Sequence, residues 1–253
     1  MKFAICQVSV APLRAESSDQ SEMVSQILFG EKVNILESKK NWVKIKAEFD
    51  GYEGWADSKQ FLEISEEEFN SIRIEKYASE SFNLAVEKDN PVTLPMAVSL
   101  PNLENGKIKF GSLEMEYLGE FFSGKLEKST IPDLALLFLN TPYLWGGKSV
   151  FGIDCSGLVQ QVYKFSGIKL PRDAYQQAEI GHALSFVEEA EPGDLAFFDN
   201  PEGKIIHVGI ILEENKIIHA HGKVRIDPMD STGIFNTDSQ MYSHKLRVIK
   251  QIL

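Results

Sequence analysis

Apolar and polar residues alternate in short runs over the first 64 residues. The alternating runs cover 4–10, 23–28, 32–36 and 42–46, and turn residues such as Gly30 separate them. A period of two is typical of strands with one buried face, and short strands divided by turns are typical of small sheets or barrels. The pattern predicts a small all-β domain over residues 1–64.

A short acidic segment follows this domain. Ser65 precedes three glutamates and Phe69, an arrangement that suits the N-cap and first turn of a helix, so residues 65–76 are expected to form a linker helix. Alternation then resumes at 82–86 and 107–110, between turns rich in glycine and proline. We expect a second, divergent β-barrel over residues 77–127; the alternative is an irregular β insert.

The pattern changes to a helical period from about residue 128. A helix with proline near its start is expected at 131–139. The Gly-rich stretch 143–153 leads into another helix, whose apolar stripe consists of Leu158, Val159, Val162 and Tyr163.

The start of that second helix carries the first candidate for chemistry. Asp154 suits the N-cap, which places Cys155 in the first turn, where the helix dipole favours an anion. A thiol there is expected to have a lowered pKa and to act as a nucleophile. The alternative is a buried structural cysteine.

Two histidines can meet on a predicted hairpin of strands 206–212 and 216–222. A three-residue loop, with Leu212 opposite Lys216, brings His219 opposite Gly209 and puts His207 and His219 on one face, whereas a two-residue loop puts them on opposite faces. We predict the three-residue loop, in which Gly209 leaves room for the ring. The alternative is that both are ordinary sheet histidines. Further strands are expected at 195–198 and 245–249, and a short helix up to Gln177.

Several motifs in the last 125 or so residues occur in the order and spacing of one family. These are Pro142-Tyr143-Leu144-Trp145-Gly146-Gly147, Asp154-Cys155-Ser156-Gly157-Leu158-Val159, Pro171-Arg172-Asp173, Pro192-Gly193-Asp194-Leu195, His207-Val208-Gly209-Ile210 and Ile218-His219-Ala220. The segment closely resembles the NlpC-type cell-wall cysteine peptidases. The resemblance implies a papain-like fold with Cys155 as nucleophile, His207 as general base and His219 as the residue that orients the base.

The N-terminal pattern resembles the bacterial SH3-like domain of wall-lytic proteins. It consists of Leu13-Arg14, Ser21-Glu22, Gly30-Glu31, Trp42 and Gly54-Trp55. The expected fold class is therefore α+β: a papain-like catalytic domain over 128–253, preceded by two small SH3-like barrels.

The resemblance also implies a substrate. Relatives with SH3-like domains cut the γ-D-glutamyl bond to a diamino acid in murein peptides with a free N-terminal L-alanine, releasing L-Ala-γ-D-Glu. The predicted substrate contacts are Glu22 for the ammonium group, Tyr52, Tyr143, Asp154 and Ser156. The alternatives are a solvated glutamate, a packed tyrosine and an aspartate that only caps its helix.

Two neighbouring positions leave the specificity open. Arg172 can bind a substrate carboxylate or anchor the structure, and we favour the anchor. Ala174 stands where relatives tend to have serine, which removes one possible hydrogen bond to the substrate. Lysine and diaminopimelate cannot be distinguished as the preferred diamino acid.

Charge and composition exclude other classes of protein. The net charge of −11, from 26 basic and 37 acidic residues, argues against nucleic acids and charge-held membranes as partners. Two cysteines do not make a disulfide framework, so Cys6 is read as a leftover thiol in a strand. No cofactor is expected, and we expect a monomer.

The apolar run 3–6 is too short for a signal peptide, which predicts a cytoplasmic protein. Three alternatives remain. The first is a secreted endopeptidase on intact peptidoglycan, and the second is a non-enzymatic wall-binding protein. The third is a zinc site made from His207, His219, His221 and Asp227, although the expected metal content is none.

Overall fold

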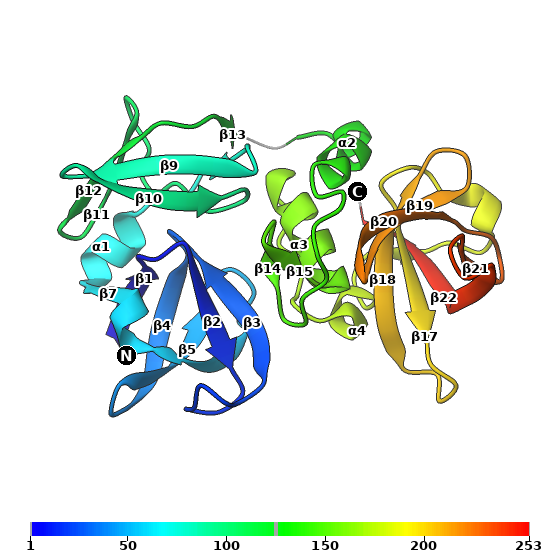
Figure 1. Ribbon diagram of the computed structural model, residues 1–253, viewed down its shortest axis with the longest axis horizontal. Coiled ribbons are helices and arrows are strands. Elements are labelled where there is room, and N and C mark those ends of the chain that lie inside the picture. The colour runs from blue at the N-terminus through cyan, green and yellow to red at the C-terminus, as the bar shows by residue number, and fades with distance from the viewer. Residues whose placement is uncertain (1, 124–125, 253) are drawn as a thin grey trace. The chain divides into compact units, whose positions relative to one another are not determined.

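The computed structural model describes residues 2–123 and 126–252 (Figure 1). Met1 and Leu253, at which the first and last predicted domains begin and end, lie outside the described residues. The chain divides into two compact units. The first contains Met1–Gly124 and Trp145–Phe151, and the second contains Lys125–Leu144 and Gly152–Leu253.

A curled antiparallel sheet forms the start of the first unit. Its strands are β1 (Lys2–Cys6), β2 (Val10–Arg14), β3 (Met23–Leu28), β4 (Lys32–Lys39), β5 (Trp42–Ala47), β6 (Glu53–Asp57) and β7 (Phe61–Ile64), with the 3-10 turn η1 (Ser58–Gln60) before β7. They lie in the order β3-β2-β6-β5-β4-β1-β7. Alternate side chains point inward and make a core that includes Leu13, Val33 and Ile45. The predicted strand 23–28 is confirmed with its bounds.

The predicted strand over 4–10 is wrong as one element. β1 ends at Cys6 and β2 begins at Val10. The reason is that the two halves have different neighbours: β1 pairs with β4 and β7, whereas β2 pairs with β3 and β6. The chain therefore bends between them. Cys6 is buried at the end of β1, and its thiol contacts the carbonyl oxygens of Val8 and Ile27 at 3.3 and 3.6 Å.

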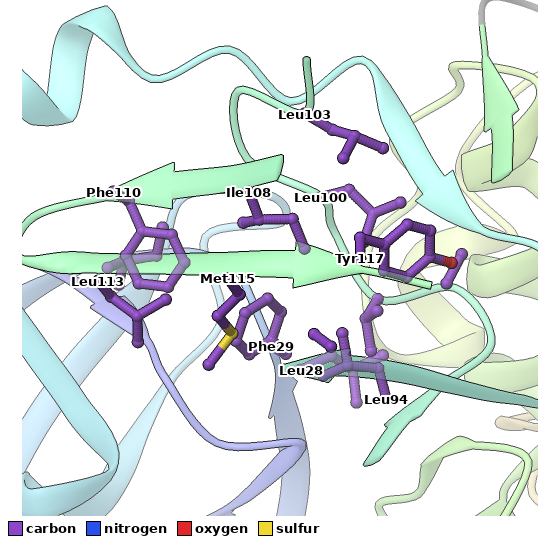
Figure 2. Close-up of a cluster of buried hydrophobic side chains, with 14 of the residues drawn as sticks. Leu28, Phe29, Leu94, Leu100, Leu103, Ile108, Phe110, Leu113, Met115 and Tyr117 are labelled. Atoms are coloured by element: carbon purple, nitrogen blue, oxygen red, sulfur yellow. The ribbon is translucent and has the colours of Figure 1, made fainter. Parts of the chain in front are cut away.

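The rest of the first unit packs around a second hydrophobic core, to which Ile5 and Leu28 of the first sheet also contribute. It contains α1 (Glu66–Ser71), β8 (Lys76–Ala78), β9 (Phe82–Glu87), β10 (Asn90–Pro95), β11 (Lys107–Phe110), β12 (Leu113–Tyr117), β13 (Phe121–Ser123) and, from further along the chain, β14 (Lys148–Ser149). The hydroxyl of Ser65 accepts the Glu68 N–H at 3.1 Å, which confirms the predicted cap. β10-β9-β12-β11 form one antiparallel sheet, and β13 pairs with β8. Figure 2 shows Leu28 and Phe29 of the first sheet packed against Leu94 and Met115. Whether this segment is a second SH3-like barrel stays a prediction.

The second unit combines three α-helices with an antiparallel sheet. Its elements are η2 (Lys128–Thr130), α2 (Ile131–Leu136), β15 (Gly152–Ile153), α3 (Cys155–Phe165), α4 (Ala174–Gln177), β16 (His182–Ala183), η3 (Val187–Glu189), β17 (Leu195–Asp199), β18 (Ile205–Leu212), β19 (Lys216–His221), β20 (Lys223–Pro228), β21 (Gly233–Asn236) and β22 (Met241–Gln251). The sheet has the order β16-β22-β17-β18-β19-β20, and β21 pairs with β22. Helix α3 packs against β18 and β19 (Figure 1).

Helix α3 is buried on every side, although its sequence predicted one apolar stripe. Gln160, Gln161 and Lys164 are buried together with Leu158 and Val162. The segment after the helix covers part of the polar face, because the Gln160 side-chain amide donates to the Leu170 carbonyl at 3.0 Å. In the part of the chain that the structure describes, no helix has both the length and the apolar character that crossing a membrane requires.

Helix α2 ends three residues earlier than the pattern predicted. Beyond Leu136, the N–H groups of Phe138 and Leu139 bond to carbonyls three residues back, which is turn geometry. Asn140 then takes a left-handed conformation with φ of 68°, which prevents a helical continuation.

Candidate active site

Cys155 is held at the first position of α3 by its N-cap. Asp154 has extended backbone angles, and its Oδ1 accepts the Gly157 N–H at 2.7 Å, which confirms the predicted cap. The loop before it needs glycine at position 152, because a Cβ there would lie 2.7 Å from the Cβ of Leu144. The sequence therefore fixes both the approach of the chain and the start of the helix.

A buried ion pair ties this helix start to the loop after α3. Arg172 donates from Nη1 to Asp154 Oδ1 at 3.0 Å and from Nη2 to Oδ2 at 2.6 Å, and from Nη1 also to the Ser156 hydroxyl at 2.9 Å. Burial opposes the charge of Arg172, but the Asp154 carboxylate outweighs it and raises the Arg172 pKa. These contacts are what the anchor interpretation of Arg172 expects.

The histidine hairpin has the predicted register. Leu212 lies opposite Lys216 and Gly209 lies opposite His219, which confirms the three-residue loop. Glu214 and Asn215 in this loop have positive φ angles of 58° and 55°. A Cβ at position 209 would lie 2.7 Å from Ile217 Cδ1 and 3.0 Å from His219 Cβ, so glycine makes the room that was expected.

The two histidines meet, and an aspartate continues the row. His207 Nε2 lies 2.9 Å from His219 Nδ1, and His219 Nε2 lies 3.1 Å from Asp227 Oδ2. All three side chains are buried. The sequence singled out Asp227 only as a possible zinc ligand; its strand β20 was not predicted, and the pairing of β20 with β19 brings it to His219.

Helix α3 packs against β18, which brings the thiol to the backbone beside His207. The backbone N–H of Val208, the next residue, donates a hydrogen bond to the Cys155 sulfur. Since His219 occupies Nε2 of His207, the ring nitrogen left for the thiol is Nδ1. The roles of Cys155, His207 and His219 stay predictions, with geometry that suits them.

The expected lowering of the Cys155 pKa is wrong in this structure. Burial raises the pKa of the thiol to about 12, and the charge of Asp154 adds to this, while hydrogen bonds from Val208 and Ser156 and the charge of Arg172 act against it. Burial also lowers the pKa of His207, helped by the nearby His244 and His219 rings. Both groups are therefore neutral at rest, because burial outweighs the helix dipole.

Four of the five histidines gather here, but their geometry does not suit a shared metal ion. Nitrogens of His207, His219 and His244 lie within 4.8 Å of one another. However, the rings of His207 and His244 stack at 4.1 Å with an angle of 21°. Imidazole binds metals through a lone pair in the ring plane, and two nearly parallel rings cannot both direct that lone pair at an ion between them. The zinc alternative made from His207, His219, His221 and Asp227 is not favoured either, because both ring nitrogens of His219 already bond to members of that set, His207 and Asp227. His221 lies 5.0 Å from His244, ring to ring.

The predicted substrate contacts of the second unit lie around Cys155. Tyr143 is 36% exposed, and burial together with the neighbouring acidic groups of Cys155 and Asp154 raises its pKa to about 12, so the phenol stays protonated and can donate. The Ser156 hydroxyl is engaged with Arg172 and, at 3.3 Å, with Asp154 Oδ1. Ala174 begins α4. Substrate contact by Tyr143, Asp154 and Ser156 stays a prediction.

The other two predicted contacts lie in the first unit. Glu22 Oε1 accepts the indole N–H of Trp145 at 2.6 Å, and Trp145 is 61% exposed. Trp145 is followed by Gly146, where a Cβ would lie 2.5 Å from the Met23 carbonyl oxygen, so the segment runs closely along β3. Tyr52 packs partly buried against the core of the first sheet, as the packing alternative expects. Substrate contact by either residue stays a prediction.

Two known families match separate segments of the chain. Residues 140–242 match the NlpC/P60 family, and residues 13–61 match the bacterial dipeptidyl-peptidase SH3 domain. The first match contains Cys155, His207 and His219, and the second contains Glu22 and Tyr52.

Curated relatives match over both segments. The chain is 32% identical to a gamma-D-glutamyl-L-lysine dipeptidyl-peptidase from Bacillus subtilis, over 78% of this chain and 71% of that protein. It is 27% identical to dipeptidyl-peptidase 6 from Lysinibacillus sphaericus, over 90% and 92% of the two chains. A solved NlpC/P60 family protein from Bacillus cereus has a TM-score of 0.83 over 99% of both chains at 22% identity, so it shares the fold.

Proposed function

The chain belongs to the NlpC/P60 family and is a cysteine peptidase, and on this basis we propose that it cleaves the γ-D-glutamyl bond to a diamino acid in murein peptides with a free N-terminal L-alanine. The products would be L-Ala-γ-D-Glu and the peptide that begins with the diamino acid. The observation that carries the proposal is the match to a gamma-D-glutamyl-L-lysine dipeptidyl-peptidase over 78% of this chain and 71% of that protein, together with the separate match of residues 13–61 to the bacterial dipeptidyl-peptidase SH3 domain.

The chemistry begins from a neutral thiol and a neutral imidazole. His207 takes the thiol proton through Nδ1 as the Cys155 sulfur attacks the γ-carbonyl carbon. N–H groups at the start of α3 stabilise the oxyanion. His207 then gives the proton to the leaving amine, and water, activated by the same ring, releases L-Ala-γ-D-Glu from the sulfur.

Burial of the two reacting groups has a consequence for the attack. Each charge alone is costly to form in this environment, since burial raises the pKa of Cys155 to about 12 and lowers that of His207. The thiolate and the imidazolium are therefore expected to form together, as substrate binds, and to stabilise each other.

The enzyme would release a dipeptide because it recognises the N-terminal ammonium group of the substrate, two residues before the bond that is cut. Glu22 is the proposed partner, with the Trp145 indole holding one carboxylate oxygen at 2.6 Å and fixing the direction of the other. Acetylation removes the positive charge and adds bulk, so blocked peptides would be poor substrates. A role in cell-wall peptide recycling, as a monomer in the cytoplasm, belongs to the same proposal.

The test is hydrolysis of L-Ala-γ-D-Glu-L-Lys and its diaminopimelate counterpart, each with a free and an N-acetylated terminus. We expect the wild type to cut only the free peptides and Cys155→Ala to cut none. Equal cleavage of blocked peptides would refute the ammonium site and favour an endopeptidase on intact peptidoglycan. Absence of cleavage by the folded wild type would favour a binding protein. The ratio between the two free peptides gives the preferred diamino acid.

A further inference from the structure

A carboxylate lies behind the histidine pair and completes a row of buried hydrogen bonds. His207 Nε2 meets His219 Nδ1 at 2.9 Å, and His219 Nε2 meets Asp227 Oδ2 at 3.1 Å. We propose that Asp227 is a positioning residue of the active site, which sets the tautomer of His219 and, through it, that of His207. The inference rests on the proposed role of His207 as the base.

The proton positions follow from the acceptor at the end of the row. An ionised carboxylate only accepts hydrogen bonds, so His219 must carry its hydrogen on Nε2. A neutral imidazole has one N–H, and Nδ1 of His219 is then an acceptor that needs the hydrogen on Nε2 of His207. This leaves Nδ1 of His207 with a lone pair, which is the form that can take the proton of the thiol.

Asp227 is fixed well enough to impose this order. Arg225 donates from Nε to Oδ2 at 2.6 Å and from Nη2 to Oδ1 at 2.9 Å, and the Thr237 hydroxyl donates to Oδ1 at 3.1 Å. Burial opposes the ionisation of Asp227, but the hydrogen bonds from His219, Arg225 and Thr237 outweigh it and lower its pKa. The carboxylate therefore stays an acceptor over the working range of pH.

This row of hydrogen bonds also explains how an imidazole, that of His219, can serve as the third residue of the catalytic triad. Alone, a neutral His219 is a weak partner for the imidazolium that His207 becomes during attack. With Asp227 behind it, negative charge lies one ring away. The other titratable groups around the two histidines are Cys155, His221, His244 and Arg225, and Arg225 is the cation that pairs with Asp227. Asp227 thus acts on His207 indirectly, through the His219 ring, whereas the carboxylate of a Ser-His-Asp triad contacts the base directly.

The decisive variant is Asp227→Asn, which keeps the shape of the side chain. Oδ1 accepts from Arg225 Nη2 and from both the N–H and the hydroxyl of Thr237, so the amide oxygen will take this position. The amide NH₂ will then replace Oδ2, face His219 Nε2 and turn it into an acceptor. Both rings then exchange tautomers, and Nδ1 of His207 carries a hydrogen. We expect kcat to fall about 10²–10⁴-fold, where the upper end is the loss that the same Asp→Asn change causes in a Ser-His-Asp triad, with KM changed by less than about threefold. Asp227→Glu should recover part of the loss.

Asp238→Asn is the matched control. It removes a carboxylate from the same arginine, since Arg225 Nη1 lies 2.5 Å from Asp238 Oδ2, but Asp238 is exposed on the far side of Arg225 from His219. Its kcat should stay within about twofold of wild type, as expected for an exposed ion pair. Equal kcat values for Asp227→Asn and wild type would overturn the inference, and so would equal losses in the two variants. A wild type that cuts no peptide would instead refute the proposed function.

A direct measurement does not depend on activity or on the folding of a variant. Long-range ¹H–¹⁵N spectra of the full chain with ¹⁵N-labelled histidine report which ring nitrogen is protonated. We expect His219 of the wild type to carry its hydrogen on Nε2 with Nδ1 unprotonated. Protonation of His219 on Nδ1 would overturn the inference. In Asp227→Asn the hydrogen should move to Nδ1, which a merely structural role of Asp227 would not predict.

Discussion

Replacing Arg172 by methionine removes the cation from the start of the catalytic helix and keeps most of the side-chain volume. Asp154, which is 6% exposed, would then lose the cation that donates to both of its carboxylate oxygens. Breaking a buried ion pair by removing one partner costs about 3–5 kcal/mol in the free energy of unfolding. For a chain of this length, that corresponds to a fall in Tm of about 6–20 °C.

Urea unfolding and thermal melting of the full chain measure this loss. Arg73→Met is the control, because its partner Glu104 is 3.7 Å away and both side chains are more than 70% exposed (71% and 75%), so it should change stability by less than about 1 kcal/mol. The double variant Asp154→Asn/Arg172→Met should be more stable than Arg172→Met, since asparagine caps a helix without a charge. A loss below about 1 kcal/mol in Arg172→Met, or no recovery in the double variant, would refute the reasoning.

Four further predictions follow from the same geometry. In a Cys6→Ala background, alkylation of Cys155 by iodoacetamide should speed up about tenfold per pH unit from pH 7 to pH 9, because the Cys155 pKa lies at about 12; a plateau near pH 7 would contradict this. The acid limb of kcat/KM should lie below about pH 6.5, the ordinary pKa of histidine, because burial lowers the pKa of His207 and the base stays unprotonated; a limb at or above this pH would contradict the prediction. Gly209→Ala should destabilise the protein by about 1–3 kcal/mol and lower kcat, because the new Cβ would lie 3.0 Å from His219 Cβ; unchanged kcat would argue against it. Glu22→Gln should raise KM for free-amine peptides with little change for acetylated ones, and an equal effect on both would remove Glu22 from the ammonium site.

The active-site hairpin could be predicted from the sequence because local rules decide it. Side chains alternate along a strand, so the length of the loop alone determines which histidines share a face, and Gly209 opposite His219 follows from the same count. The cap at Asp154 is equally local.

Features that depend on a third element could not be predicted in this way. Asp227 reaches His219 only because β20 pairs with β19. The alternation of polar and apolar residues over 223–227 is typical of a strand, but it does not say which strand is its partner. The raised pKa of Cys155 depends on burial by surrounding elements, which outweighs the helix start that the sequence shows. The break between β1 and β2 likewise arises because the two halves pair with different strands.

The path of the chain between the two units limits whether either unit can be separated or exchanged as an independent module. The first unit takes in Trp145–Phe151 from the middle of the peptidase sequence, so the chain passes between the units after Gly124, Leu144 and Phe151. A fragment starting at Lys128 would carry this segment without its partners, among them Gln26 and Glu31, which bind Lys148. Gene fusion or exchange of the SH3-like region is therefore expected to succeed only when residues 145–151 change with it, so the two parts should evolve as one inherited block.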